Sequence, residues 1–213
     1  MLSSPRHHLL PLLLLTLLLS QCEQIGTAIL GKTITPDVIR GAETRPTWYQ
    51  YLPEKAPGFC LRTTRTLIWR DPLLQLGYWR GVDPDHPSRV YMEARGSTLI
   101  IYPGYTWDGM TIGTTTSADL PSTLLHDALY HALAAGASFP RLLADRAFLR
   151  QRRLAGLPGT RLQYRVIRLF GWPSSRPHGT PTLRLIPTTP TTPTAYPLSP
   201  ITYPLHPPAS AHR

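Results

Sequence analysis

The C-terminal end, rich in proline and threonine, limits how much of this 213-residue chain is able to form a packed core. From Pro173 to Arg213 the sequence contains no acidic residue, and most of it reads PTLRLIPTTPTTPTAYPLSPITYPLHPP. Proline fixes φ and removes a backbone donor, which favours extended, solvated chain over packed structure. Residues 173–213 are therefore predicted to be a disordered tail.

The N-terminal end also differs from a packed domain. A weakly basic start leads into an apolar run from Leu9 to Leu19, which ends at LLSQC. A membrane span needs roughly 20 apolar residues, so this shorter run fits the hydrophobic region of a secretory signal. Residues 1–22 are predicted to be a signal peptide or a lipoprotein leader, with Cys22 lipidated in the second case. If Cys22 is lipidated or removed with the leader, Cys60 has no cysteine partner. If Cys22 stays in the chain unmodified, the two cysteines are able to pair in an oxidising compartment.

The predicted leader determines the expected location. With a working leader the protein is exported or anchored to the membrane, on the periplasmic or outer face. Without one, it stays in the host cytoplasm or belongs to a virion. The leader or an attached lipid is the expected contact with a membrane.

A strong positive charge restricts the choice of partners. The formal net charge is +10, and eight arginines fall between Arg141 and Arg168, where the only acid is Asp145. Such a basic face attracts nucleic acid, acidic lipid or an anionic wall polymer. Zinc-finger spacing and aromatic RNA-binding motifs are missing from the sequence, which argues against nucleic acid. A cell-envelope polymer or a phage protein is the expected partner.

Residues 47–172 are predicted to form a single α+β domain, in which a small, mostly antiparallel sheet precedes a cluster of about three helices. The first part holds segments rich in β-branched and aromatic residues, namely LRTTRTLIWR, RVYMEAR and STLIIYPGYTW. A helical pattern follows. Asp119 and Ser138 are the expected N-caps of the first two helices, the second ending near Ala155. A third helix covers RLQYRVIRLF up to Gly171. The connection around Gly136 is short, so the first two helices should form an antiparallel pair.

The first predicted helix, in the stretch LLHDALYHAL, carries polar groups beside an apolar stripe. His126 and Asp127 flank the stripe on opposite sides, and each has a partner one turn later, because side chains four residues apart meet on a helix. His126 is expected to contact Tyr130, and Asp127 to contact His131. The second pair resembles a two-ligand metal clip or a carboxylate that orients an imidazole. A weak ion pair at the boundary of the core is the alternative.

Asp145 falls in line with the apolar stripe of the second helix, where an acid needs a partner or a proton. Counted from the turn of the helical hairpin, Asp145 is level with Asp127 and close to His126. It is therefore expected to bond the His126 ring or to share an ion with Asp127. Neutralisation by Arg146 or Arg150 is the alternative.

Asp108, in YTWDGMT, lies where a predicted strand ends. It is either a site residue or a turn aspartate that bonds its own backbone. The candidate catalytic residues are Asp108, His126, Asp127, Tyr130 and Asp145. A divalent metal is the candidate cofactor, and its candidate ligands are Asp108, His126, Asp127 and Asp145.

The ordered motifs WDGMT, LHDALYHA, LADRAF and YRVIRLFG resemble a phage- and prophage-associated family known as domain of unknown function 1353. The matching residues are Asp108, Thr111, His126, Asp127, Leu129, Tyr130, Ala144, Asp145, Phe170 and Gly171. The resemblance covers roughly Cys60 to Trp172. It implies a phage origin and the same site residues, without an established activity.

Three classes of function follow. In the first, a metal-dependent hydrolase acts at the cell envelope on peptide, glycan or phosphodiester, with the three aspartates and His126 leaving an open position for water. A His-Asp phosphohydrolase is a less favoured version, because the upstream region offers only the loop residue His86 as a further ligand. In the second, a non-catalytic phage structural, assembly or envelope-anchored protein uses the polar cluster as a buried network. The third is a nucleic-acid-binding module.

Overall fold

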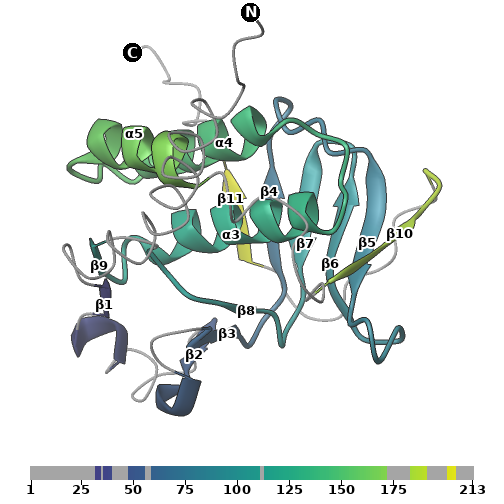
Figure 1. Cartoon of the computed structure of the whole chain (residues 1–213), viewed down its shortest axis with the longest axis horizontal. Coiled ribbons are helices and arrows are strands. Elements are labelled where there is room, and N and C mark those ends of the chain that lie inside the picture. The colour runs from purple at the N-terminus through teal and green to yellow at the C-terminus, as the bar shows by residue number, and fades with distance from the viewer. Residues whose placement is uncertain are drawn as a thin grey trace, which may run out of the picture.

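The computed structural model describes residues 32–34, 36–39, 48–55, 59–110, 113–171, 183–190 and 201–204. The predicted leader with Cys22, and Thr111 of the WDGMT motif, lie outside these residues. Cys60 is buried. The described part is an α+β fold, as the sequence predicts (Figure 1).

The largest layer is a six-stranded sheet with the order β10-β5-β6-β7-β4-β11. Its strands are β4 (Leu67–Arg70), β5 (Tyr78–Val82), β6 (Val90–Arg95), β7 (Thr98–Ile101), β10 (Arg184–Pro187) and β11 (Ile201–Pro204). All neighbouring pairs are antiparallel except β4 and β11, which are parallel. The prediction of a mostly antiparallel sheet is confirmed.

Two smaller sheets lie beside it. β2 (Tyr49–Tyr51), β3 (Leu61–Thr63) and β8 (Thr106–Trp107) form an antiparallel sheet, and β1 (Lys32–Ile34) runs parallel to β9 (Gly113–Thr115). A short 3₁₀ helix covers Pro53–Lys55. Because β8 leads directly into Asp108, the three-stranded sheet fixes the position of that residue relative to the helices.

Two segments of the C-terminal tail do not follow the prediction of disorder. Arg184–Pro187 pairs with β5, and Ile201–Pro204 pairs with β4, so the tail supplies both edge strands of the main sheet. Edge strands tolerate proline, because one side of the strand needs no backbone donor. Leu183 is 3% exposed and packs over Gly81, where a Cβ would meet the leucine side chain at 2.8 Å. An apolar anchor therefore holds this part of the tail.

Three helices follow β9: α3 (Leu120–Ala134), α4 (Arg141–Leu154) and α5 (Thr160–Phe170). In Figure 1, α3 lies across the front of the six-stranded sheet, with α4 and α5 above it. The prediction of three helices is confirmed, but the expected start of the second one is wrong. α4 begins after Pro140, because the residue before a proline disfavours helical dihedrals and Phe139 occupies that position. Ser138 therefore lies outside the helix.

Asp119 occupies the predicted N-cap position of α3, but its side chain makes no cap hydrogen bond to that helix. One carboxylate oxygen accepts hydrogen bonds from the backbone N–H of Thr116, at 2.9 Å, and from its hydroxyl, at 2.6 Å. The other oxygen pairs with Arg152 in the last turn of α4. This ion pair joins the start of one helix to the end of the next, as the predicted antiparallel hairpin requires.

The core lies between the main sheet and the helical hairpin. α3 has buried side chains on most of its circumference, because sheet residues contact one face of the helix and α4 contacts another. The largest fully buried side chains include Trp69, Trp107 and Phe148. No described helix combines the length and the apolar character that crossing a bilayer requires.

Candidate functional site

Asp145 lies at the centre of a polar cluster that joins the three helices. Its side chain is completely buried, and its Oδ1 accepts a hydrogen bond from the Tyr130 hydroxyl at 2.6 Å. Its Oδ2 accepts a hydrogen bond from Arg168 at 2.6 Å and lies 3.4 Å from Nε of Arg141. Burial alone would raise the pKa of Asp145, but hydrogen bonds from His126, Tyr130 and Arg168 lower it to about 2. Asp145 is therefore a fixed negative charge at neutral pH.

The arginines that neutralise Asp145 are not the expected ones. Arg146 is exposed, and Arg150 pairs with Asp71. Arg141 lies one turn before Asp145 on α4, and Arg168 reaches it from α5. The position of Arg168 depends on how α5 packs, which helical spacing within α4 does not reveal.

His126 lies between two carboxylates. Its Nε2 is 3.4 Å from Oδ1 of Asp145, and its Nδ1 is 3.6 Å from Oδ1 of Asp127. Burial by itself lowers the pKa of His126, but the hydrogen bonds and charges of Asp127 and Asp145 outweigh it and raise the pKa above its usual value. The centroid of the ring also lies 4.1 Å from that of the Tyr130 ring, with the two planes tilted by 39°, which confirms the contact expected one turn later.

Asp127 and Asp108 form a close carboxyl pair. Burial raises the pKa of Asp127, and the charge of Asp108 and a hydrogen bond with it raise the pKa further, to about 7, against the opposing effect of His126. Oδ2 of Asp127 is buried and accepts no hydrogen bond from the described residues. A buried carboxylate oxygen without a donor is costly, so this pair favours a shared proton or a bound cation.

The local sequence around Asp108 explains its placement. Trp107, the last residue of β8, donates a hydrogen bond of 3.3 Å to Thr123 on α3 and thereby holds the strand end against the helix. Gly109 has a φ of 80°, and a Cβ there would lie 2.7 Å from the Thr115 hydroxyl. That hydroxyl accepts a hydrogen bond from the Met110 N–H at 2.8 Å. Glycine is thus required directly after Asp108, where the chain turns towards β9.

The expected pair of Asp127 and His131 does not form. Nδ1 of His131 instead lies 2.6 Å from the Tyr105 hydroxyl, and Phe59 contacts the ring edge-on at 5.4 Å. Burial lowers the pKa of His131 to about 4, so the ring is neutral at physiological pH and shares its hydrogen bond with the Tyr105 hydroxyl as an uncharged group. The charges of Asp127 and Asp108 add to burial in raising the pKa of Tyr105. Tyr105 and His131 therefore border the carboxyl pair.

The donor set fits a metal ion only in part. Both oxygens of Asp145 already accept hydrogen bonds, which suits a residue that orients His126 better than a metal ligand. Asp108 and Asp127 remain as oxygen donors. Within the described ranges, no three His, Cys, Asp or Glu side chains form a group ready to hold a metal.

Sequence reasoning missed several residues of this cluster. Tyr105 comes from the strand region, and Arg141 and Arg168 come from the basic helices. Gly171, which the family resemblance includes, has a contact in the cluster that the sequence did not predict. A Cβ on Gly171 would lie 2.7 Å from the Tyr130 hydroxyl, so this glycine makes room for the tyrosine that bonds Asp145. The motifs LYHA and LFG contained the signal, because Tyr130 of the first and Gly171 of the second meet within the cluster.

Comparison of the chain with models of protein families, with curated proteins and with solved structures finds no match.

Proposed function

We propose that this chain is a hydrolase that works by general acid–base catalysis at the Asp108–Asp127 carboxyl pair and His126. The supporting observation is geometric: a carboxyl pair adjoins an imidazole that a second, fully buried carboxylate holds in place. Asp127 is 12% and His126 6% exposed at the side chain, and Asp108 is half-buried, so the cluster is enclosed but reachable from Asp108.

Each residue has a role that its environment favours. Asp127 exchanges a proton near neutral pH, where a general base or acid is most effective. Asp108 keeps that proton available through its charge. His126, whose pKa is raised, is the proton donor, and Asp145 positions its ring. Tyr130 fixes Asp145 and therefore acts through it.

Binding of a divalent cation is the second candidate role of the Asp108–Asp127 carboxyl pair. Oδ2 of Asp127 lacks a hydrogen-bond donor, and an oxygen ligand from each of two chain segments suits a hard cation. Such an ion would supply Lewis-acid polarisation of a substrate oxygen. The cation would then replace the proton that the carboxyl pair otherwise shares.

The leader-like sequence directs the choice of substrate. Polymers of the cell envelope, with their peptide, glycan and phosphodiester bonds, are the first substrates to test. The proposed setting is the envelope of a phage-infected or lysogenic cell. The non-catalytic alternative keeps the same contacts but assigns them only to packing.

The test compares Asp127→Asn with Asp85→Asn, which alters an exposed loop acid. Release of soluble fragments from envelope preparations is measured across pH, with added divalent cations and with a chelator. We expect the Asp127 variant to lose activity by about 100-fold or more, as removal of a general acid or base does, while its folded fraction stays unchanged. A folded wild-type protein that releases nothing under any condition would support the non-catalytic alternative.

A further inference from the structure

The outward face of α5 combines exposed leucines with unpaired arginines. Leu162 is 68% exposed and Leu169 is 71% exposed. Arg161 and Arg165 are exposed as well. At 100° per residue these four side chains fall within about a third of the helix circumference. They form one continuous surface, called the α5 outer face below.

The structure divides the eight arginines of the helical region into two groups. Four have acidic partners inside the fold: Arg141 and Arg168 with Asp145, Arg150 with Asp71, and Arg152 with Asp119. The side chains of the other four are exposed and make no ion pair or hydrogen bond with another described residue; they belong to Arg146, Arg153, Arg161 and Arg165. α4 and α5 contain one acid, Asp145, and it is buried. The outer positive charge is therefore not neutralised within these helices.

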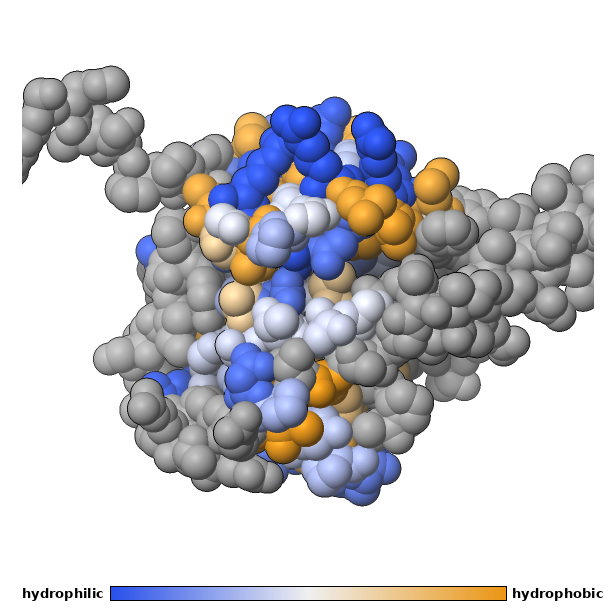
Figure 2. Space-filling model, turned by 90° about the vertical axis from the view of Figure 1, so that its left-hand side faces the viewer, coloured by the Kyte–Doolittle hydropathy of each residue, from blue (hydrophilic) through white to orange (hydrophobic). Residues whose placement is uncertain are grey.

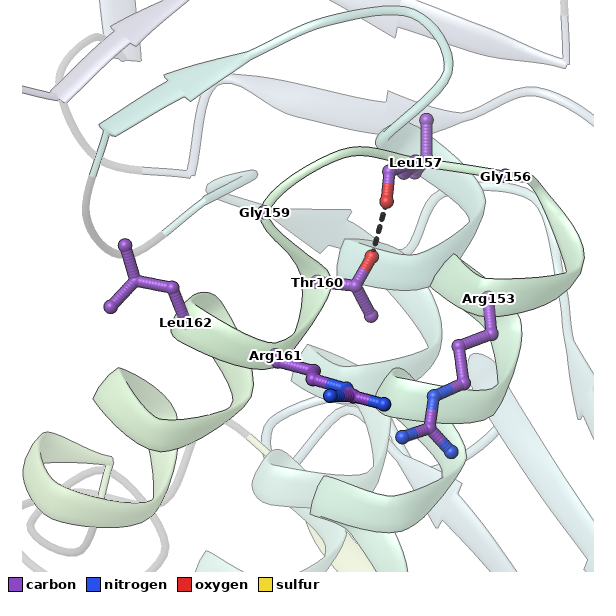
Figure 3. A pocket seen from close by; sticks show the side chains of 7 residues that line it. All are labelled: Arg153, Gly156, Leu157, Gly159, Thr160, Arg161 and Leu162. Atoms are coloured by element: carbon purple, nitrogen blue, oxygen red, sulfur yellow. Dashed lines mark hydrogen bonds between the residues drawn. The ribbon is translucent and has the colours of Figure 1, made fainter.

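Both kinds of side chain gather in one region of the surface. Strongly hydrophilic and strongly hydrophobic residues lie next to each other at the top of Figure 2, the level at which α5 lies in Figure 1. An open pocket of about 530 Å³ adjoins this region and includes Arg153, Arg161 and Leu162 in its lining. Figure 3 shows Arg153 and Arg161 extending towards each other from α4 and α5. Two guanidinium groups without an acid leave room for an anionic group between them.

We propose that the α5 outer face docks onto an anionic lipid surface. Arginines attract the acidic headgroups, while the two protruding leucines enter the boundary of the acyl chains, as on amphipathic helices that lie in the plane of a membrane. The pocket between Arg153 and Arg161 receives a headgroup phosphate. Nucleic acid would satisfy the arginines, but it offers no apolar phase for leucines that are more than two-thirds exposed. This inference is independent of the proposed catalytic function.

The experiment measures binding of the full chain to sedimented vesicles of phosphatidylcholine, with and without phosphatidylglycerol, at low and high salt. One variant carries Arg161→Gln and Arg165→Gln, and another carries Leu162→Ser and Leu169→Ser. The control carries Arg70→Gln and Arg184→Gln, which remove the same charge from exposed sheet positions. All variants keep residues 1–22, so any contribution of the leader appears equally on neutral vesicles.

We expect tighter binding to the anionic vesicles and a steep loss with salt. Each arginine substitution should weaken binding about fivefold at low salt, and the leucine variant should weaken it about tenfold or more. The control should bind as the wild type does. Because the altered side chains are exposed, circular dichroism should show unchanged folding.

Two results would overturn the proposal. One is equal binding of the wild type and the α5 variants to anionic vesicles. The other is binding to duplex DNA or to an acidic polypeptide that depends on the arginines but not on the leucines, together with no preference for anionic lipid. The second result would assign the α5 outer face to a different class of partner.

Discussion

The Tyr130 hydroxyl on α3 donates a 2.6 Å hydrogen bond to Asp145 on α4. This contact lies between two helices that a short turn makes antiparallel, at the level where His126 reaches the same carboxylate oxygen. Because Asp145 is completely buried, its four partners stabilise its charge and also fix the positions of the residues that supply them.

Replacing Asp145 by asparagine should destabilise the protein. The substitution leaves Arg168 and Arg141 without their acid, and breaking a buried ion pair costs about 3 kcal/mol or more. Chemical denaturation at neutral pH measures this loss, with Asp85→Asn as a surface control. The pKa of Asp145 is lowered by folding, so its contribution is complete at neutral pH and is lost as pH falls from about 4 towards 2. The difference between the wild type and the variant should therefore shrink over that acidic range.

Asp127→Asn should have the opposite effect on stability. Folding raises the pKa of Asp127 to about 7, so between about pH 4 and pH 7 the folded state holds a proton that the unfolded state has lost, and stability decreases as pH rises. Asparagine removes this penalty and should increase the free energy of unfolding at pH 8 by roughly 2 to 4 kcal/mol. Denaturation curves from acidic to alkaline pH provide the test. A variant that is less stable than the wild type at pH 8 would contradict the carboxyl pair.

The two histidines of α3 should titrate differently. The pKa of His131 is about 4, so its ring should remain neutral between about pH 5 and pH 8, while the ring of His126 should lose its proton above the usual histidine range. NMR spectra of the ring signals across pH distinguish the two. Tyr105→Phe removes the hydroxyl that bonds Nδ1 of His131 and should shift the His131 signals much more than those of His126.

Gly171→Ala should be destabilising for a steric reason. The added Cβ would lie 2.7 Å from the Tyr130 hydroxyl and 2.8 Å from the Ile167 carbonyl, and overpacking of this kind costs about 1 to 3 kcal/mol. In a Tyr130→Phe background the first clash disappears, so alanine should cost less. A double-mutant cycle on unfolding free energies measures this coupling. Additive effects would show that the two residues do not meet.

Leu183→Ala tests whether the tail belongs to the fold. Leu183 is 3% exposed, so removing its side chain should cost about 2 to 3 kcal/mol. Arg184→Gln, at the neighbouring exposed position, should leave the unfolding midpoint unchanged. A neutral Leu183→Ala substitution would instead favour the disordered tail that the proline content predicts.

The sequence by itself determines the α+β class, three helices and the approach of His126 to both Tyr130 and Asp145. These features depend on local periodicity and on a short turn, which act over a few residues. The position of Asp145 beside His126 also follows from counting residues along the two helices from the turn near Gly136, because each residue advances the helix by a fixed rise.

Tertiary structure alone decides which partners those residues obtain. Arg168 reaches Asp145 because α5 packs against α4. Tyr105 forms a hydrogen bond with His131 because the chain leading into β8 lies against α3. The tail forms two edge strands because the main sheet offers unpaired backbone groups on both sides. Such contacts join positions far apart in the chain, and no local pattern of residues encodes the separation at which they meet.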